Sequence, residues 1–165
     1  MPRVYLGLGS NIDPATNLRL AVRELRFHFG QLRLSSVYRS TPLGFDGDDF
    51  LNAVVGLNTD LPPEEIPPLL DDIHAMAGRA RDKRKLVSRT LDIDFLLYDR
   101  LVLDRRGLRL PRRDVLMYGF VLRPLAELAP DYLHPETGRR LAEHWRHFDA
   151  RSHPLSRVSI DLNGA

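Results

Sequence analysis

Two aspartates, Asp92 and Asp94, stand one residue apart in the stretch SRTLDIDFLLYD, residues 88–99. The apolar run from Phe95 to Tyr98 that follows them is typical of a buried strand. Because side chains alternate between the two faces of a strand, both carboxylates are expected on one face, roughly 6 to 7 Å apart. Partly buried carboxylates at that distance repel each other unless a positive group lies between them.

A divalent cation is one group that would relieve this repulsion. Mg²⁺ prefers hard oxygen ligands, and it usually completes its coordination with water and the phosphates of a substrate. The alternative is a strand end that faces solvent, with neighbouring arginines capping the two carboxylates. Arginines are dense on both sides of the aspartates, in residues 79–89 and 105–113, so the residues alone leave both interpretations open.

The chain of 165 residues is long enough to bury a substantial core, and we expect residues 1–165 to form a single domain. Its composition, 43% hydrophobic and 28% charged, is ordinary for a globular protein. No stretch approaches the roughly 20 apolar residues of a membrane span, and the N-terminus leads into a strand pattern and not into a signal peptide. We therefore expect a cytoplasmic protein. The absence of cysteine excludes disulfides, thiolate metal sites and a cysteine nucleophile.

The basic residues are almost all arginines: of the 24 Lys and Arg residues, only Lys83 and Lys85 are lysines. Arginine suits bidentate contact with phosphate, so an RNA-binding module is a rival hypothesis. Against it, the net charge is only +2, and the aromatic central-strand signature of RNA-recognition domains is absent. Asp92 and Asp94 would also repel phosphates without a metal, so we predict no nucleic-acid partner.

Hydrophobic periodicity predicts four strands and two helices in the order βαββαβ, which is that of a ferredoxin-like α+β sandwich. The predicted strands span residues 4–9, 32–39, 50–58 and 91–98, and the predicted helices span 14–29 and about 61–78. We expect an antiparallel sheet with helices packed on one face and loops free for function on the other. An extra C-terminal hairpin over 101–110 and short helices near 122–128 and from 141 would follow. The buried stripe of the second helix is expected to include Met76.

Five sequence motifs occur in one order and spacing along the chain. They are YLGLGSNI at 5–12, SSVYRSTPLG at 35–44, FLNAVV at 50–55, GRARDKR at 78–84 and RTLDIDFLLYD at 89–99. In these motifs the chain resembles the 6-hydroxymethyl-7,8-dihydropterin pyrophosphokinases, over about its first 130 residues. The resemblance implies an enzyme of folate biosynthesis that transfers a pyrophosphoryl group from ATP to the pterin hydroxymethyl group and releases AMP.

By this resemblance, Asp92 and Asp94 hold two Mg²⁺ ions that bridge ATP and the pterin hydroxyl. Such a transfer requires that charge on the phosphate oxygens is neutralised and that the nucleophile is held in line. The resemblance adds Arg79 and Arg89 to the aspartates as catalytic residues. The expected ATP contacts are Arg81, Lys85, Arg89, Arg112 and Tyr118. Residues 79–88 resemble the catalytic lid of the family, which closes over both substrates.

On the pterin side, the resemblance implies that Asn52 bonds the ring edge and that Phe50 and Phe120 stack on the ring. A flat heteroaromatic ring needs such a stacking slot and a few fixed polar groups. The residues expected along the adjoining loop are Ser40, Thr41 and Leu43. Without the resemblance, both phenylalanines would be interpreted as core. The expected partners are ATP and a reduced pterin, and the expected assembly is a monomer or weak dimer.

The sequence departs from the family pattern on the nucleotide side. In LPRRDVLMYGFVLRPL, residues 110–125, Arg112 stands where the family typically has a histidine and Tyr118 where it has an arginine. In the lid, Leu86-Val87-Ser88 replaces Trp-Gly-Pro. Arg112 can still bind phosphate, because a guanidinium is permanently charged. Two alternatives to the family reaction follow: a divergent paralogue acting on a different pterin, and a protein that binds ATP or pterin without catalysis.

The six histidines form no set with the spacing of metal ligands. Surface or packing roles are therefore expected for them. Among them, His74 falls on the second predicted helix, near the nucleotide side of the family.

Overall fold

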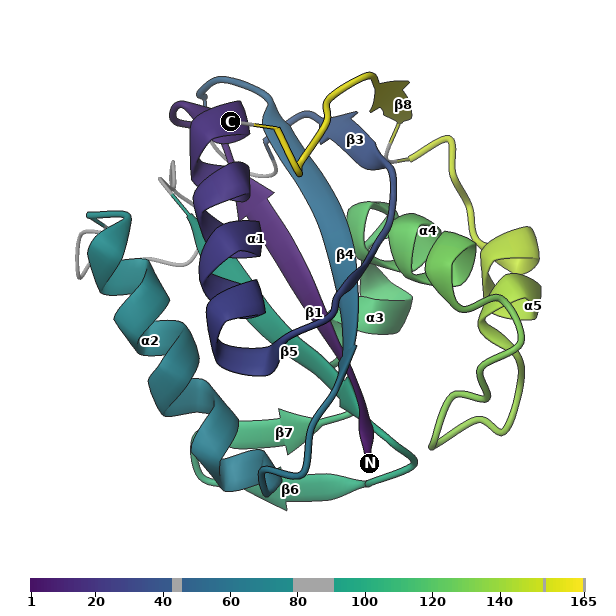
Figure 1. The fold of residues 1–165 in the computed structure, drawn as a ribbon. Helices are drawn as coiled ribbons and strands as arrows, with labels where there is room; N and C mark the ends of the chain where they lie inside the picture. Colours follow the sequence, from purple (N-terminus) through teal and green to yellow (C-terminus); the bar gives the residue numbers. More distant parts are fainter. Residues whose placement is uncertain (43–45, 79–90, 153, 165) are drawn as a thin grey trace.

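The computed structural model describes residues 1–42, 46–78, 91–152 and 154–164. Its main feature is a six-stranded sheet whose described strands all pair antiparallel (Figure 1). The strands are β1 (Arg3–Ser10), β2 (Arg33–Leu34), β3 (Val37–Ser40), β4 (Phe50–Asn58), β5 (Asp92–Tyr98) and β8 (Leu155–Val158). Their order is β5-β1-β4-β3-β8, with β2 also pairing β4. The strands β1, β3, β4 and β5 therefore have the predicted βαββαβ connections, which confirms the α+β sandwich.

Helices cover both faces of this sheet. They are α1 (Pro14–Phe29), α2 (Ile66–Met76) after the 3₁₀ turn η1 (Pro63–Glu65), α3 (Asp114–Met117), α4 (Gly119–Leu128) and α5 (Leu141–His147). In Figure 1, α1 and α2 lie on one side of the sheet, and α4 with its neighbours α3 and α5 lies on the other. The prediction of loops alone on the second face is wrong, because the apolar stripe of α4 also has to be buried.

Alternation along β1 produces two separate cores. Leu6 and Leu8 are buried with Leu18 and Leu25 of α1 in the first core. Tyr5, one residue away, belongs to a second core under α4. Each central strand thus contributes side chains to both faces, as a period of two requires.

The predicted strand over residues 32–39 is divided into β2 and β3. The interruption falls at Ser35, whose hydroxyl accepts a hydrogen bond from the backbone N–H of Val54 at 2.8 Å and donates one to the carbonyl of Ser36 at 2.8 Å. Local side-chain bonds of this kind compete with a regular ladder. The strand β8 at the far edge of the sheet, which pairs with β3, was not predicted.

The second predicted helix begins later than its sequence suggests, since Pro63–Glu65 form the 3₁₀ turn before α2. Met76, expected on the buried stripe, is 55% exposed at the last position of α2. The predicted hairpin is present as β6 (Leu103–Arg105) and β7 (Leu108–Leu110). None of the helices in the described ranges is long and apolar enough to span a membrane.

Candidate functional site

The two aspartates of β5 lie on the α4 face of the sheet. Asp92 stands opposite Gly9 of β1, and Asp94 stands opposite Gly7. Ile93 between them is buried in the core of the α1 face. The side chains of Asp92 and Asp94 therefore share one face, as the spacing predicts.

Burial and mutual repulsion shape the charge of this pair. Burial, together with the nearby charge of Asp92, raises the pKa of Asp94 to about 8, although Arg112 acts in the opposite direction. Near neutral pH the pair therefore favours a bound proton or a cation. Hard carboxylate oxygens with space for other ligands fit Mg²⁺. Because no group of three or more His, Cys, Asp or Glu residues in the described ranges could hold a metal, water and substrate would have to complete the coordination.

Arg112 is the cation that lies beside the pair. Its backbone N–H donates to the carbonyl of Leu96 at 2.9 Å, which holds it along β5. Its Nη2 lies 3.5 Å from Asp94 Oδ1, and its Nε lies 3.3 Å from Asp114 Oδ1. Burial alone would lower the pKa of Arg112, but these carboxylates raise it. The capping arginine that the sequence left open is therefore present, and its guanidinium lies beside Asp94.

Asn52 lies in the same row as Asp92, two strands away. Gly9 pairs with Asn52 of β4 on one side and with Asp92 of β5 on the other. At one interstrand spacing per step, the Cα atoms of Asn52 and Asp92 are roughly 10 Å apart. Asn52 is buried, and its Oδ1 accepts a hydrogen bond from the Ser40 hydroxyl at 2.7 Å. The amide is thus fixed in orientation on the face that carries the carboxylates.

Glycine at the centre of the row leaves space for two neighbouring side chains. A Cβ atom at Gly9 would lie 3.0 Å from Asn52 Nδ2 and 4.0 Å from Phe50 Cδ1. The Asn52 amide and the Phe50 ring therefore both extend over Gly9. Ser40 stands opposite Phe50 in the β3–β4 ladder, and Thr41 follows it as an exposed residue.

The second aromatic group comes from the opposite layer. Phe120 is half-buried in the first turn of α4 and packs on the core of that face. The Tyr118 ring stacks on Phe120, with centroids 5.0 Å apart and an interplanar angle of 14°. Tyr118, which the resemblance assigned to the nucleotide, thus contacts one of the residues assigned to the pterin.

Comparison with known proteins connects this geometry to one family. Residues 5–130 match the model of the family described as 7,8-dihydro-6-hydroxymethylpterin-pyrophosphokinase (HPPK). The chain belongs to the HPPK family. The matched residues include β1, β4 and β5, so all the described site residues lie within the HPPK match.

Relatives in two bacteria carry the name 2-amino-4-hydroxy-6-hydroxymethyldihydropteridine pyrophosphokinase. The protein of Methylorubrum extorquens is 44% identical over 135 residues, which cover 79% of this chain and 85% of the relative. The protein of Pseudomonas aeruginosa is 40% identical over 146 residues, covering 86% and 88%. These likenesses extend over most of both chains.

Among solved structures, the Plasmodium falciparum HPPK-DHPS wild type superposes with a TM-score of 0.72 at 12% identity. The likeness covers 91% of this chain and 45% of that chain, so our protein spans less than half of the longer one. At this identity the likeness concerns the fold. It confirms that the α+β arrangement described above is that of HPPK structures.

Several residues assigned by sequence lie outside the described ranges. They are Leu43, Arg79, Arg81, Lys85 and Arg89, together with the rest of the predicted lid, residues 79–88. Their roles stay predictions. The described residues bring Asp92, Asp94 and Asn52 to one face with Phe50 and Phe120.

His74 of α2 makes a hydrogen bond to β5 that the sequence did not predict. It is buried, and its Nε2 accepts a hydrogen bond from the backbone N–H of Ile93 at 2.8 Å. Its Nδ1 lies 3.7 Å from Asp71 Oδ1. Within the described ranges β5 is the edge strand of the sheet, and His74 gives this N–H a side-chain acceptor. The signal in the sequence is the position of His74 one turn after Leu70, on the buried stripe of the helix.

Proposed function

We propose that this HPPK-family protein transfers a pyrophosphoryl group from ATP to the hydroxymethyl group of 6-hydroxymethyl-7,8-dihydropterin, in folate biosynthesis. The observation that carries the proposal is the row across three strands, with a fixed amide at Asn52 and a carboxylate pair at Asp92 and Asp94. The relatives that are named for this reaction support it.

The atoms of the transfer balance without a further reactant. The hydroxymethyl oxygen bonds to the β-phosphorus of ATP, and the bond from that phosphorus to the oxygen bridging it to the α-phosphorus breaks. AMP leaves with the bridging oxygen, and the hydroxyl proton is released. The chain has to orient the hydroxyl in line with the breaking bond and balance charge on the phosphate oxygens.

Asp92 and Asp94 are the residues that would hold Mg²⁺. When bound, Mg²⁺ neutralises charge on the phosphate oxygens and lowers the cost of bringing ATP beside the carboxylates. The raised pKa of Asp94 and the repulsion within the pair favour a cation at this position. We expect two ions, as the family resemblance implies.

The pterin would lie over Gly9, between the two aromatic side chains. Asn52, held by Ser40, would bond the polar edge of the ring, and Phe50 and Phe120 would stack on its faces. The loop residues Thr41 and Leu43 would close one side. Removal of water from the slot would strengthen each polar contact.

The phosphates would be bound by basic side chains on the opposite side of the carboxylates. Arg112 already lies beside Asp94, and its guanidinium can contact two oxygens at once. The other residues proposed for this role are Arg79, Arg81, Lys85 and Arg89, with Tyr118 at the margin of the nucleotide. Arg79 and Arg89 are proposed as catalytic residues because their charge would act on the transferred group.

Two further proposals concern the location and the assembly of the protein. We propose that it acts in the cytoplasm as a monomer or weak dimer. ATP and the reduced pterin are its proposed partners, since the described site offers groups for small polar substrates.

The test is AMP formation from ATP and 6-hydroxymethyl-7,8-dihydropterin with Mg²⁺, in the unchanged protein and in Asp94→Ala. We expect turnover that falls by at least about 100-fold in the variant, because the loss of one preorganised charge contact costs this much. Asp104→Ala, at an exposed position of β6, is the matched control and should retain turnover. Unchanged turnover in Asp94→Ala would contradict the assignment.

The pairing of Arg112 with Asp94 is a reason to test two alternatives to this function. In this state the guanidinium lies beside a carboxylate that the metal would need. If the unchanged protein releases no AMP, a panel of other reduced pterins tests for a divergent paralogue. Calorimetric titration with ATP and pterin then distinguishes a binding protein that has lost catalysis.

A further inference from the structure

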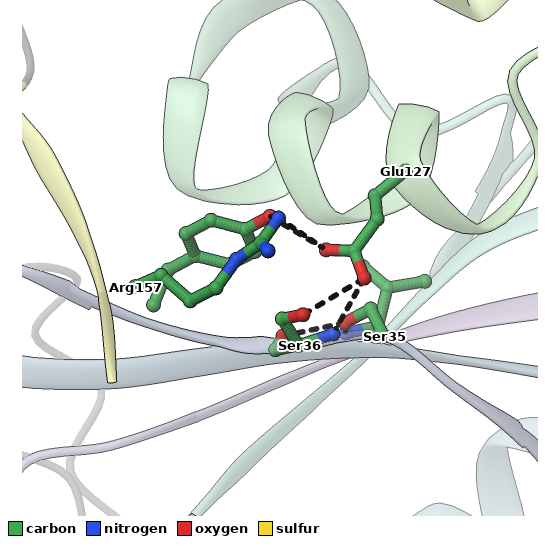
Figure 2. Close-up of polar contacts among 6 residues, drawn as sticks. Ser35, Ser36, Glu127 and Arg157 are labelled. Atoms are coloured by element: carbon green, nitrogen blue, oxygen red, sulfur yellow. Dashed lines mark hydrogen bonds and ion pairs between the residues drawn. The ribbon is translucent and has the colours of Figure 1, made fainter. Parts of the chain in front are cut away.

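A polar cluster joins α4 to β3 on the face that carries the site (Figure 2). One carboxylate oxygen of Glu127 accepts hydrogen bonds from the backbone N–H of Ser36 at 3.0 Å and from its hydroxyl at 2.9 Å. The other oxygen accepts one from the Tyr38 hydroxyl at 2.5 Å. Arg157 of β8 donates to that hydroxyl at 3.2 Å and lies 3.9 Å from Glu127.

The negative charge of Glu127 strengthens the hydrogen bonds between α4 and β3 in this cluster. Burial alone would raise the pKa of Glu127, but the hydrogen bonds from Tyr38 and Ser36 and the charge of Arg157 lower it. Burial and the bond to Glu127 raise the pKa of Tyr38, so its hydroxyl stays a donor. A carboxylate that accepts three hydrogen bonds holds its partners more strongly than neutral groups do.

The cluster also connects the two walls of the proposed pterin slot. Phe120, Arg123 and Glu127 lie three and four residues apart, on one face of α4. The Arg123 guanidinium lies 4.8 Å from the centroid of the Tyr38 ring, so α4 contacts Tyr38 at two points. Tyr38 is the strand partner of Asn52. Phe120 and Asn52 are therefore linked through a short series of specific contacts.

We propose that Glu127 is a positioning residue for pterin binding, which sets the separation of Phe120 from Asn52 by holding α4 to Ser36 and Tyr38. The inference rests on the proposed function, which puts the pterin between these two side chains. The Glu127 carboxylate is occupied by its protein partners and acts through Phe120. Its removal should weaken pterin binding, while ATP binding at the carboxylate pair is retained.

The experiment measures KM for pterin, KM for ATP and kcat in Glu127→Ala, Glu127→Gln and Tyr38→Phe. We expect KM for pterin to rise about tenfold in Glu127→Ala. The rise should be smaller in the other two variants, which keep some of the hydrogen bonds between α4 and β3. KM for ATP and kcat at saturating pterin should stay within about twofold. The control is Glu64→Gln, which breaks an exposed ion pair with Arg105 of 2.9 Å and should change none of the three constants.

The outcomes separate this inference from the proposed function. A lower melting temperature with an unchanged KM for pterin would mean that Glu127 only stabilises the fold, and would overturn the inference. An equal rise in the KM of both substrates would overturn it as well. If Glu127→Ala does not fold, Tyr38→Phe, which removes one oxygen atom, gives the same test. If the unchanged protein neither turns over nor binds pterin in calorimetry, the proposed function fails, and this inference fails with it.

Discussion

The two faces of the sheet are built from the same strands, yet they differ in what their side chains do. On the α1 face, Leu6 and Leu8 of β1 lie with Ile93 of β5 in a continuous apolar core. On the α4 face, the same two strands present Gly9, which is buried, and Asp92, which is only partly buried.

With this arrangement a small sheet can carry polar side chains on one face and keep a stable apolar core on the other. The carboxylates and the amide of the site have buried apolar neighbours that anchor their strands from the other face: Ile93 lies between Asp92 and Asp94, and Leu51 and Ala53 flank Asn52. A side chain that stabilises the core and a side chain of the candidate site therefore occupy neighbouring positions in the sequence. Substitutions in the apolar core of the α1 face should change stability, whereas substitutions in the row of Asn52, Gly9 and Asp92 on the α4 face should mainly change activity.

The largest expected effect is a loss of stability when a buried side chain of the α1 face is truncated. Leu6 is fully buried, and Leu6→Ala should lower the free energy of unfolding by about 2 to 5 kcal/mol, because a cavity is added to the lost transfer energy. Activity per folded molecule should stay within about twofold. Urea unfolding and an active-site titration measure the two quantities. Leu133→Ala, at a position 37% exposed, is the control and should cost less than about 0.5 kcal/mol.

A smaller effect is expected from filling the row on the functional face. In Gly9→Ala the new Cβ would lie 3.0 Å from Asn52 Nδ2, so the amide has to move. We expect KM for pterin to rise about tenfold, with little change in melting temperature. Gly7→Ala is the matched control, since its Cβ would lie 3.4 Å from the flexible Leu96 side chain. Equal effects of the two substitutions would argue against Asn52 as a pterin contact.

Arg112→His tests the carboxylate end of the same face. Loss of the guanidinium removes a competitor for Asp94, 3.5 Å away, and also the proposed phosphate contact. At pH 8, where histidine is largely neutral, half-maximal activity should require less Mg²⁺, while KM for ATP should rise about fivefold. Arg113→His, on the exposed neighbour, controls for loss of charge. A higher Mg²⁺ requirement in Arg112→His would mean that the arginine does not compete with the metal.

Much of the fold follows from local patterns in the sequence. The apolar spacing of α1 and the alternation in β4 and β5 predict elements that the structure contains, and the shared face of Asp92 and Asp94 follows from the same alternation. Helices on both faces and the strand β8 were not predicted, because both depend on pairing between distant segments. The segment after about residue 130 has no strong period of its own.

The candidate site divides in the same way. Family resemblance supplied its residue types, but the contacts that fix them depend on three-dimensional neighbours. The bond from Ile93 to His74 exists because β5 is an edge strand, and the contact of Arg112 with Asp94 depends on how the chain returns after β7. Glu127 is an exposed residue of α4, and its hydrogen bonds to Ser36 and Tyr38 follow only from the placement of β3 beside α4.

The smallest expected effect concerns the way each face holds its helices. Apolar packing holds α1, whereas α4 is also held by ionised Glu127. Hydrogen bonds from Tyr38 and Ser36 hold the pKa of Glu127 below its ordinary value, despite burial, which acts to raise it. A depressed carboxyl pKa contributes stability that is present above the ordinary pKa, roughly 4.3, and is lost as the pH falls through the folded value. The stability difference between the unchanged protein and Glu127→Gln should therefore be largest at pH 6 and shrink towards pH 3.

Urea unfolding at each pH, followed by fluorescence of the single tryptophan, measures this difference. Trp145 lies on α5, and the guanidinium of Arg123 from α4 lies 5.8 Å from its ring centroid, so its emission reports on the α4 side. Glu24→Gln on α1, next to a largely exposed partner at Arg23, is the matched control for the loss of one carboxylate from a helix. A constant difference between Glu127→Gln and the unchanged protein from pH 3 to pH 6 would mean that Glu127 holds α4 by shape and not by charge. In that case α4 would be held to the sheet by packing alone, as α1 is.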